Sequence, residues 1–184
     1  METIVTETRQ WTRAEVAELL IGKTALTELT REAALQVVDL LTTEHVAAGT
    51  VLIEEGVTST GFMALVLEGE AIVQNSIAGT GESVVLGEVG PGAVFGELGI
   101  LDGKPRSATV TAVTDMDIAV LDRAALGRLI DELPGVGCAL LSAIIVRVGE
   151  RLRATNLRVQ ELVAENTRLM EKTPAIPASP VVPA

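Results

Sequence analysis

Aromatic residues are scarce in this chain of 184 residues, which contains one tryptophan, two phenylalanines and no tyrosine. Apolar residues nevertheless make up 48% of the composition, so the core must be built from aliphatic side chains. Proteins that hold single-stranded nucleic acids without sequence preference stack the bases on exposed aromatic rings. Because so few rings are available, this class of nucleic-acid binding is nearly excluded.

Cysteine and histidine occur once each. Cys138 has no second cysteine with which to form a disulfide within the chain, and a lone thiol fits a reducing compartment. His45 is the only histidine, which argues against a histidine-based metal site and against a Ser-His catalytic triad. We therefore expect neither a metal cofactor nor an enzyme.

Positive charge is also limited, since 14 Lys and Arg face 25 Asp and Glu, for a net charge of −11. Such a surface repels phosphate backbones and anionic membranes, so no direct DNA binding and no membrane binding are expected. The longest apolar stretch, residues 136–146, is shorter than the about 20 residues that span a bilayer. The first residues are polar and lack the apolar run of a signal peptide, which favours the cytoplasm.

Two helices are expected near the N-terminus, within residues 12–41. Thr12 and Glu15 have the spacing of a capping box, in which each side chain bonds to the other residue's backbone N–H at the start of a helix. Thr30 is placed as a second N-cap, ahead of apolar residues that recur at helical spacing.

Short strands are expected between residues 46 and 122, where runs of Val, Ile, Leu and Thr are separated by glycines. Residues 62–67 and 71–73 predict two strands around a tight turn at Gly69, and Gly79-Thr80-Gly81 predicts a hairpin turn. The predicted fold class is mostly β with α. The pattern is typical of an antiparallel β-barrel or sandwich, flanked by N-terminal helices and a long C-terminal helix.

Helical spacing returns from residue 124 to 172, and Pro134 divides this stretch into a short helix and a long one. The long helix carries a heptad pattern. Its a positions are Cys138, Ile145, Leu152, Val159 and Asn166, and its d positions are Leu141, Val148, Thr155, Leu162 and Leu169. Beyond residue 157 the apolar residues thin to a narrow seam, which favours a parallel homodimer; the alternative is an amphipathic helix that packs on its own domain.

The most specific chemistry lies in residues 92–113. Gly96 ends a strand, and the following residues can form one short helical turn, whose free N–H groups attract an anion. Arg106 presents a planar donor fork that matches a phosphate. Glu97 only accepts hydrogen bonds, which suits sugar hydroxyls. A pocket that binds one anion and one diol fits a ribose phosphate.

The string FGELGILDGKPRSATV, residues 95–110, resembles the phosphate-binding cassette of cyclic nucleotide-binding domains. Catabolite activator proteins and the regulatory subunits of cAMP-dependent protein kinase carry this domain. The wider resemblance covers about residues 25–157 and implies the antiparallel β-barrel or jelly roll of this family. It implies that Glu97 accepts from the ribose 2′-hydroxyl, that Arg106 pairs with the cyclic phosphate, and that Ser107 contacts the phosphate. Backbone N–H groups of Gly96, Glu97 and Leu98 would complete the site.

The resemblance also suggests the ligand. Ser107 in place of threonine leans toward cAMP over cGMP. In catabolite activator proteins a Thr-Ser pair on the long helix contacts adenine, the serine from the other subunit, and here Thr155 and Asn156 occupy the matching place. Thr155 could instead serve only the coiled coil. A ligand-free module with an internal salt bridge between Glu97 and Arg106 is the alternative for the cassette.

Four segments summarise these expectations: a helical lead-in (1–24), a nucleotide-binding barrel (25–133), a dimerising helix (134–172) and a Pro/Ala-rich tail (173–184). No DNA-binding helix-turn-helix is expected after the long helix. Prolines recur every third residue of the tail, the polyproline II period, so it is either a docking peptide or a solvated end. We therefore expect a cytoplasmic cyclic nucleotide sensor that signals to a separate, unknown partner protein. A structural or adaptor module and an indirect transcriptional regulator are the alternatives.

Overall fold

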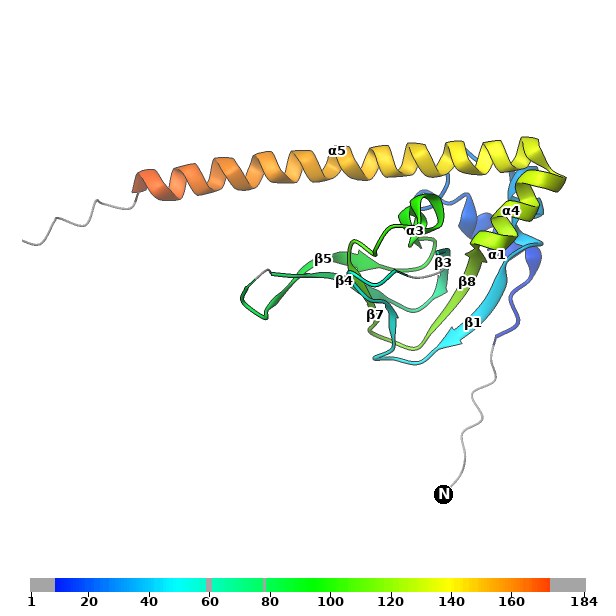
Figure 1. The fold of residues 1–184 in the computed structure, drawn as a ribbon, viewed down its shortest axis with the longest axis horizontal. Helices are drawn as coiled ribbons and strands as arrows, with labels where there is room; N and C mark the ends of the chain where they lie inside the picture. Colours follow the sequence, from blue (N-terminus) through cyan, green and yellow to red (C-terminus); the bar gives the residue numbers. More distant parts are fainter. Residues whose placement is uncertain (1–8, 59–60, 78, 173–184) are drawn as a thin grey trace, which may run out of the picture. The chain divides into compact units, whose positions relative to one another are not determined.

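Two antiparallel sheets of four strands form the body of the molecule in the computed structural model, which describes residues 9–58, 61–77 and 79–172 (Figure 1). The first sheet has the order β1 (Thr42–Val46), β8 (Met116–Asp122), β3 (Phe62–Glu68) and β6 (Val94–Phe95). The second has the order β2 (Val51–Ile53), β7 (Thr109–Ala112), β4 (Ala71–Ser76) and β5 (Ser83–Val89). The predicted jelly roll is confirmed.

The core between the sheets is aliphatic, as the composition requires. Its buried members come from both sheets: Val46, Ile53, Ala64, Val66, Ala71, Phe95, Val110, Ala112, Met116 and Ile118. Burial of this apolar surface is the main favourable term in folding, at about 25 cal/mol for each Å² removed from water.

The first sheet is covered on its outer face as well. Here α1 (Arg13–Leu20) contacts β3, and α4 (Arg123–Glu132) contacts β8 (Figure 1). A second N-terminal helix, α2 (Arg31–Val38), packs on α1. Because β3 is buried on both faces, its sequence is an unbroken apolar run in place of the alternating pattern of a half-exposed strand.

The turn at Gly69 differs from the expected one. Both strands are present, but β3 and β4 belong to different sheets, so the turn carries the chain from one sheet to the other. Gly69 has φ +85°, and a Cβ there would overlap the Asp115 carbonyl oxygen. The sheet region also starts at Thr42 and not at residue 46, because the first four residues of β1 are exposed and show no apolar pattern. The hairpin between β4 and β5 is confirmed.

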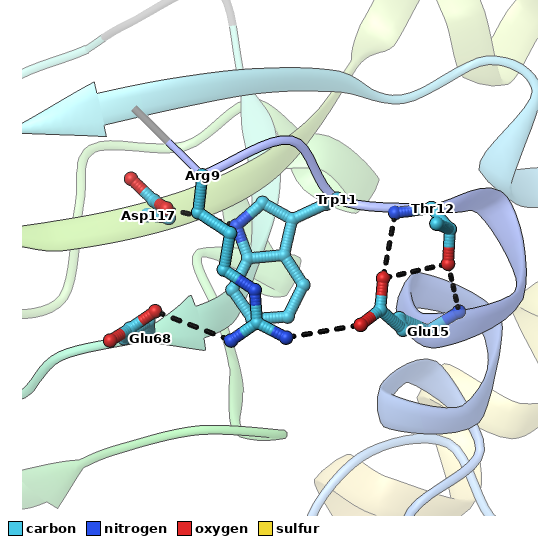
Figure 2. Close-up of polar contacts among 6 residues, drawn as sticks. All are labelled: Arg9, Trp11, Thr12, Glu15, Glu68 and Asp117. Atoms are coloured by element: carbon cyan, nitrogen blue, oxygen red, sulfur yellow. Dashed lines mark hydrogen bonds and ion pairs between the residues drawn. The ribbon is translucent and has the colours of Figure 1, made fainter. Parts of the chain in front are cut away.

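The capping box of α1 is confirmed. Glu15 N donates to Thr12 Oγ1 at 3.3 Å, and Thr12 N donates to Glu15 Oε2 at 2.9 Å (Figure 2). The Thr12 hydroxyl and amide, with Arg9, lower the pKa of Glu15 to about 2. Thr30 caps α2 in the same way by accepting from Ala33 N.

The single tryptophan ties the segment before α1 to the first sheet. Trp11 Nε1 donates to Asp117 Oδ2 on β8 at 2.9 Å, and His45 Nδ1 lies 2.8 Å from the other oxygen of the same carboxylate. The Arg9 guanidinium lies over the indole, with its Cζ 3.9 Å from the ring centre, and its Nη1 lies 3.6 Å from Glu68 Oε2 (Figure 2). This network holds α1 against β8 and β3, and nothing in the local sequence pattern predicted it.

The long helix α5 (Pro134–Lys172) begins at Pro134, as predicted. The chain divides into two compact units between Arg147 and Val148. In the first unit, Leu140, Ala143 and Ile144 of α5 are buried. In the second, the described side chains are exposed or nearly so. No described helix combines the length and the apolar character needed to cross a membrane. The proline-rich tail, residues 173–184, lies outside the described residues.

The Thr12 cap should be visible in the titration of Glu15. Thr12→Ala removes the hydroxyl, which is the largest of the contacts that stabilise the carboxylate, and keeps the backbone N–H of residue 12, so the pKa should rise from about 2 part of the way toward 4.5. The folded-state pKa is depressed, so this contribution to stability is complete above about pH 4.5 and is lost as the pH falls through about 2. Carboxyl NMR titration measures the shift. Thr12→Ser should keep the low pKa, and an unchanged value in Thr12→Ala would assign the depression to the backbone N–H of residue 12 and to Arg9.

Candidate functional site

The cassette is a tight passage from β6 through one short helix to β7. Gly96 adopts φ +78° directly after β6, and α3 (Glu97–Asp102) follows as the predicted short helical turn. Gly103 ends α3 with φ +64°. Both glycines occupy the left-handed region, where other residues are strained, so each end of α3 is set by a glycine.

Arg106 is buried inside the cassette, with only 7% of its surface exposed. Its Nη1 donates to the Gly96 carbonyl oxygen at 2.9 Å and to that of Phe62 at 3.4 Å, and its Cζ lies 4.7 Å from the centre of the Phe62 ring. Its backbone is held by Val57 and Gly56, which pair with it at 3.0 and 2.9 Å. The side chain is therefore held by residues beside β6 and on β3, and the backbone is held by the segment that follows β2.

One glycine makes room for this guanidinium, and a second makes room for a carbonyl oxygen that the guanidinium binds. A Cβ on Gly99 would overlap Arg106 Nη1 and lie 2.6 Å from its Cζ. A Cβ on Gly96 would come within 2.8 Å of the Phe62 carbonyl oxygen. The glycine spacing of the motif thus reflects the space that a buried arginine needs.

Glu97 is buried at the first position of α3, 3% exposed. Burial lowers the pKa of the Arg106 guanidinium below its usual value, and the negative charge of Glu97 raises it by a smaller amount. Arginine remains charged even so, because its pKa lies far above physiological pH. A buried cation and a buried carboxylate therefore meet at the same short helix.

The other predicted site residues are exposed. Leu98 and Ser107 lie on the cassette surface, beside Glu97 and Arg106 respectively. Thr155 and Asn156 lie in the second unit, exposed on α5, and Thr155 Oγ1 donates to the Arg151 carbonyl oxygen at 2.9 Å. The structure thus brings five of the seven predicted residues to the cassette, and the part of Thr155 and Asn156 stays a prediction.

Arg123 is a further contact of the cassette that the sequence analysis missed. It stands at the start of α4, and its Nη2 donates to the Gly99 carbonyl oxygen at 3.1 Å. Its guanidinium also lies beside Gly103. A lone arginine at a helix start gives no local signal of such a contact, because its partner is 24 residues away in sequence.

Metal ligands do not gather in the described part of the chain, where no group of three or more His, Cys, Asp or Glu side chains could hold an ion. The cassette itself supplies a guanidinium, a carboxylate and backbone N–H groups for binding a ligand.

Comparison with known proteins agrees with this chemistry. The family model of the cyclic nucleotide-binding domain matches residues 43–132. Among curated proteins, a cAMP-dependent protein kinase regulatory subunit of Yarrowia lipolytica is 40% identical over 92 residues, which cover 50% of this chain and 23% of that protein. The matched part is thus less than a quarter of this relative's own length.

Solved structures share the fold as well as the sequence motif. A cyclic nucleotide-binding domain from Methylobacillus flagellatus superposes with a TM-score of 0.71 and 26% identity, covering 81% of this chain and 83% of that one. A domain from a cyclic-GMP-dependent pathway of bacterial phytopathogenesis gives a TM-score of 0.57 and 31% identity, covering 66% of this chain and 95% of its own. The chain therefore belongs to the cyclic nucleotide-binding domain family.

Proposed function

We propose that this protein is a cyclic nucleotide sensor whose ligand is cAMP. The observation that carries this proposal is the pair of buried charges on the cassette, Arg106 and Glu97, which are 7% and 3% exposed. Removing charged groups from water is costly unless strong interactions compensate. A ligand that carries both an anionic group and hydroxyl groups would supply these interactions, because the anion pairs with Arg106 and a hydroxyl donates a hydrogen bond to Glu97.

Each cassette residue has a role in this proposal. Arg106 pairs with the cyclic phosphate through its planar donor fork. Glu97 accepts a hydrogen bond from the ribose 2′-hydroxyl. Ser107 adds its hydroxyl to the phosphate, and the backbone N–H groups of Gly96, Glu97 and Leu98 supply further donors. The family's fold serves regulation and not catalysis, so we propose a sensor and not an enzyme.

The relatives include proteins named for both ligands. The regulatory subunit of Yarrowia lipolytica is named for cAMP, and one solved structure is described in terms of a signalling pathway that depends on cyclic GMP. Ser107 favours cAMP in our proposal. Titration calorimetry of the purified protein with cAMP and cGMP is the direct test, and binding of neither would leave the ligand-free adaptor reading.

We also propose that the protein is a parallel homodimer that joins through residues 134–172. The seam of α5 exposes large apolar side chains: Leu152, Val159, Leu162 and Leu169 are 60%, 52%, 48% and 59% exposed. A contiguous exposed apolar stripe marks an interaction surface, and the heptad spacing fits a second copy of the same helix. In the dimer, Thr155 and Asn156 would contact adenine, with Asn156 reaching the nucleotide of the partner.

Ligand binding would then reposition the cassette and α5, with a coupling free energy on the order of 1–3 kcal/mol. In this proposal the lead-in (1–24) and barrel (25–133) sense the nucleotide in the cytoplasm. The output passes to a separate protein, for which the tail (173–184) is a candidate docking segment.

Arg106→Ala should abolish most of the affinity for cAMP. Truncating one side of a buried charged pair costs about 2–5 kcal/mol, or roughly 30- to 5,000-fold in affinity. Glu97→Ala should cost less, because the ribose hydroxyl is neutral, and should erase the preference for cAMP over its 2′-deoxy analogue. Calorimetry measures both, with Arg128→Ala as the control because this arginine is exposed on α4. Equal binding by wild type and Arg106→Ala would refute the proposed site.

Gly99→Ala should weaken binding without touching any ligand group. The new Cβ occupies the space of the Arg106 guanidinium, which must move. Loss of one charged hydrogen bond lowers affinity by about 10- to 150-fold. Gly127→Ala is the matched control, since a Cβ at this helical glycine meets nothing within 4 Å. Gly127→Ala should keep full affinity; an equal effect of the two variants would exclude the steric explanation.

Leu162→Asp should separate the dimer while the barrel stays folded, because two like charges would face each other in the seam. The monomer keeps the contacts of Arg106 and Glu97 but loses the contact of Asn156 in trans. Affinity for cAMP should fall by about one hydrogen bond, roughly 0.5–1.5 kcal/mol. Sedimentation and calorimetry on one sample test this, with Ala164→Asp, outside the seam, as control. A monomer with unchanged affinity would show that the site is complete within one chain.

A further inference from the structure

Asn75 occupies an inward-facing position near the end of β4. Ala71 belongs to the core cluster, Val73 packs against it, and side chains alternate along a strand. Asn75 is the next residue on that inner face. Its neighbour Gln74 lies on the opposite, exposed side, where its Nε2 donates to Ser83 Oγ at 3.4 Å. The Gln74 amide of β4 therefore points outward and contacts Ser83, whereas the Asn75 amide points inward.

The inward amide is not satisfied within the protein. Asn75 Oδ1 is buried and has no hydrogen-bond partner among the residues that the structure describes. Buried polar atoms are nearly always bonded, because desolvation without a partner destabilises the fold. Asparagine is also disfavoured in strands, where an aliphatic residue would serve this core better. The chain thus carries a local energetic cost at this position.

The sheet register places Asn75 next to the cassette. Val73 pairs with Val110, and Gln74 pairs with Thr109. One further step in this antiparallel register sets Asn75 opposite residue 108, between β7 and the predicted phosphate contact Ser107. The unpaired oxygen therefore lies at the end of the barrel that holds the nucleotide-binding motif.

Glu55 connects the end of β4 with β7 and with the cassette. Its Oε2 accepts from Ser76 N at 2.8 Å, and its backbone N–H donates to Thr109 Oγ1 at 3.0 Å. The next residue, Gly56, donates its N–H to the Arg106 carbonyl oxygen at 2.9 Å. The end of β4, the segment after β2 and the backbone of Arg106 are thus one connected cluster.

The chemistry of the unpaired atom selects a part of the ligand. A buried acceptor requires a donor, and the ionised cyclic phosphate offers only acceptors. The ribose 2′-hydroxyl is already assigned to Glu97. The remaining donors of a cyclic nucleotide are the N–H groups of its base. The side-chain amide of asparagine presents an acceptor beside a donor. This pair matches the amino group and the neighbouring N7 of adenine, whereas the same edge of guanine presents two acceptors, N7 and O6.

We propose that Asn75 reads the base: its side-chain oxygen accepts from the exocyclic amino group of adenine, and its NH₂ donates to the adjacent ring nitrogen. The second torsion of an asparagine side chain is broad, so the amide can turn toward the ligand within its rotamer. The inference rests on the proposed nucleotide binding and adds to it a residue on β4 that recognises the adenine base, beside the preference assigned to Ser107.

The test compares three ligands by calorimetry: cAMP, cGMP and the cyclic monophosphate of purine riboside, which lacks the amino group. Asn75→Leu should lower cAMP affinity by about 5- to 150-fold. Affinity for the purine riboside analogue should fall less than affinity for cAMP, because the analogue keeps the ring nitrogen that accepts from Asn75 but has no amino group whose contact could be lost. The ligand-free variant should melt no earlier than wild type, since the substitution removes a buried unpaired oxygen.

Gln74→Leu is the matched control, because it removes an amide from the other face of the same strand, and it should leave all three affinities unchanged. Asn75→Val, a strand-forming residue, provides the same comparison if Asn75→Leu does not fold. Unchanged cAMP affinity in the Asn75 variants, or an equal loss for cAMP and the analogue, would overturn base reading. In both cases wild-type binding of cAMP would leave the proposed function standing, whereas a wild type that binds none of the three ligands refutes both.

Discussion

A permanently charged guanidinium lies inside an aliphatic barrel, and much of the molecule is arranged to hold it there. Arg106 is desolvated enough that its pKa is lowered, yet it cannot lose its proton under physiological conditions. The carbonyl oxygens of Gly96 and Phe62, and the Phe62 ring below its Cζ, compensate part of the lost hydration. Gly99 leaves the volume that the side chain fills. Helix α3 and the left-handed turn at Gly96 both lie against this side chain.

The cassette is fastened to the rest of the fold at points that the motif itself does not contain. Arg123 connects α3 to α4, whereas the backbone of Arg106 is paired with the segment after β2. A shift of α3 would therefore be felt at α4 and at β2. Mechanical contact of this kind is what a sensor needs if occupation of the site is to be transmitted through the barrel.

The sequence predicted what local chemistry determines. The capping box of Thr12 and Glu15, the N-cap Thr30, the short helix after Gly96 and the break at Pro134 each depend on residues within one turn of one another, and each is present. The glycine-rich spacing of residues 46–122 also predicted short antiparallel strands in a barrel or sandwich, because glycines mark the turns of such strands, and the resemblance to cyclic nucleotide-binding domains specified the jelly roll.

Contacts between distant segments could not be predicted in this way. The pairing of Trp11 with Asp117 joins residues 106 apart, and no periodicity records it. The turn at Gly69 was expected to close two neighbouring strands, but only the packing against Asp115 and Met116 shows that it changes sheets. Asn75 lies in an ordinary strand pattern, and its inward direction becomes meaningful only when the register places it beside the cassette.

The tryptophan of the N-terminal segment has an optical consequence. As the chain has no tyrosine, Trp11 is the dominant source of its near-ultraviolet fluorescence. The indole lies under the Arg9 guanidinium and donates to Asp117, whose other oxygen faces His45. Its fluorescence emission therefore reports on the packing of α1 against the first sheet. A change in that light during denaturation would mark the release of the N-terminal helices, a local event that can precede the melting of the barrel itself.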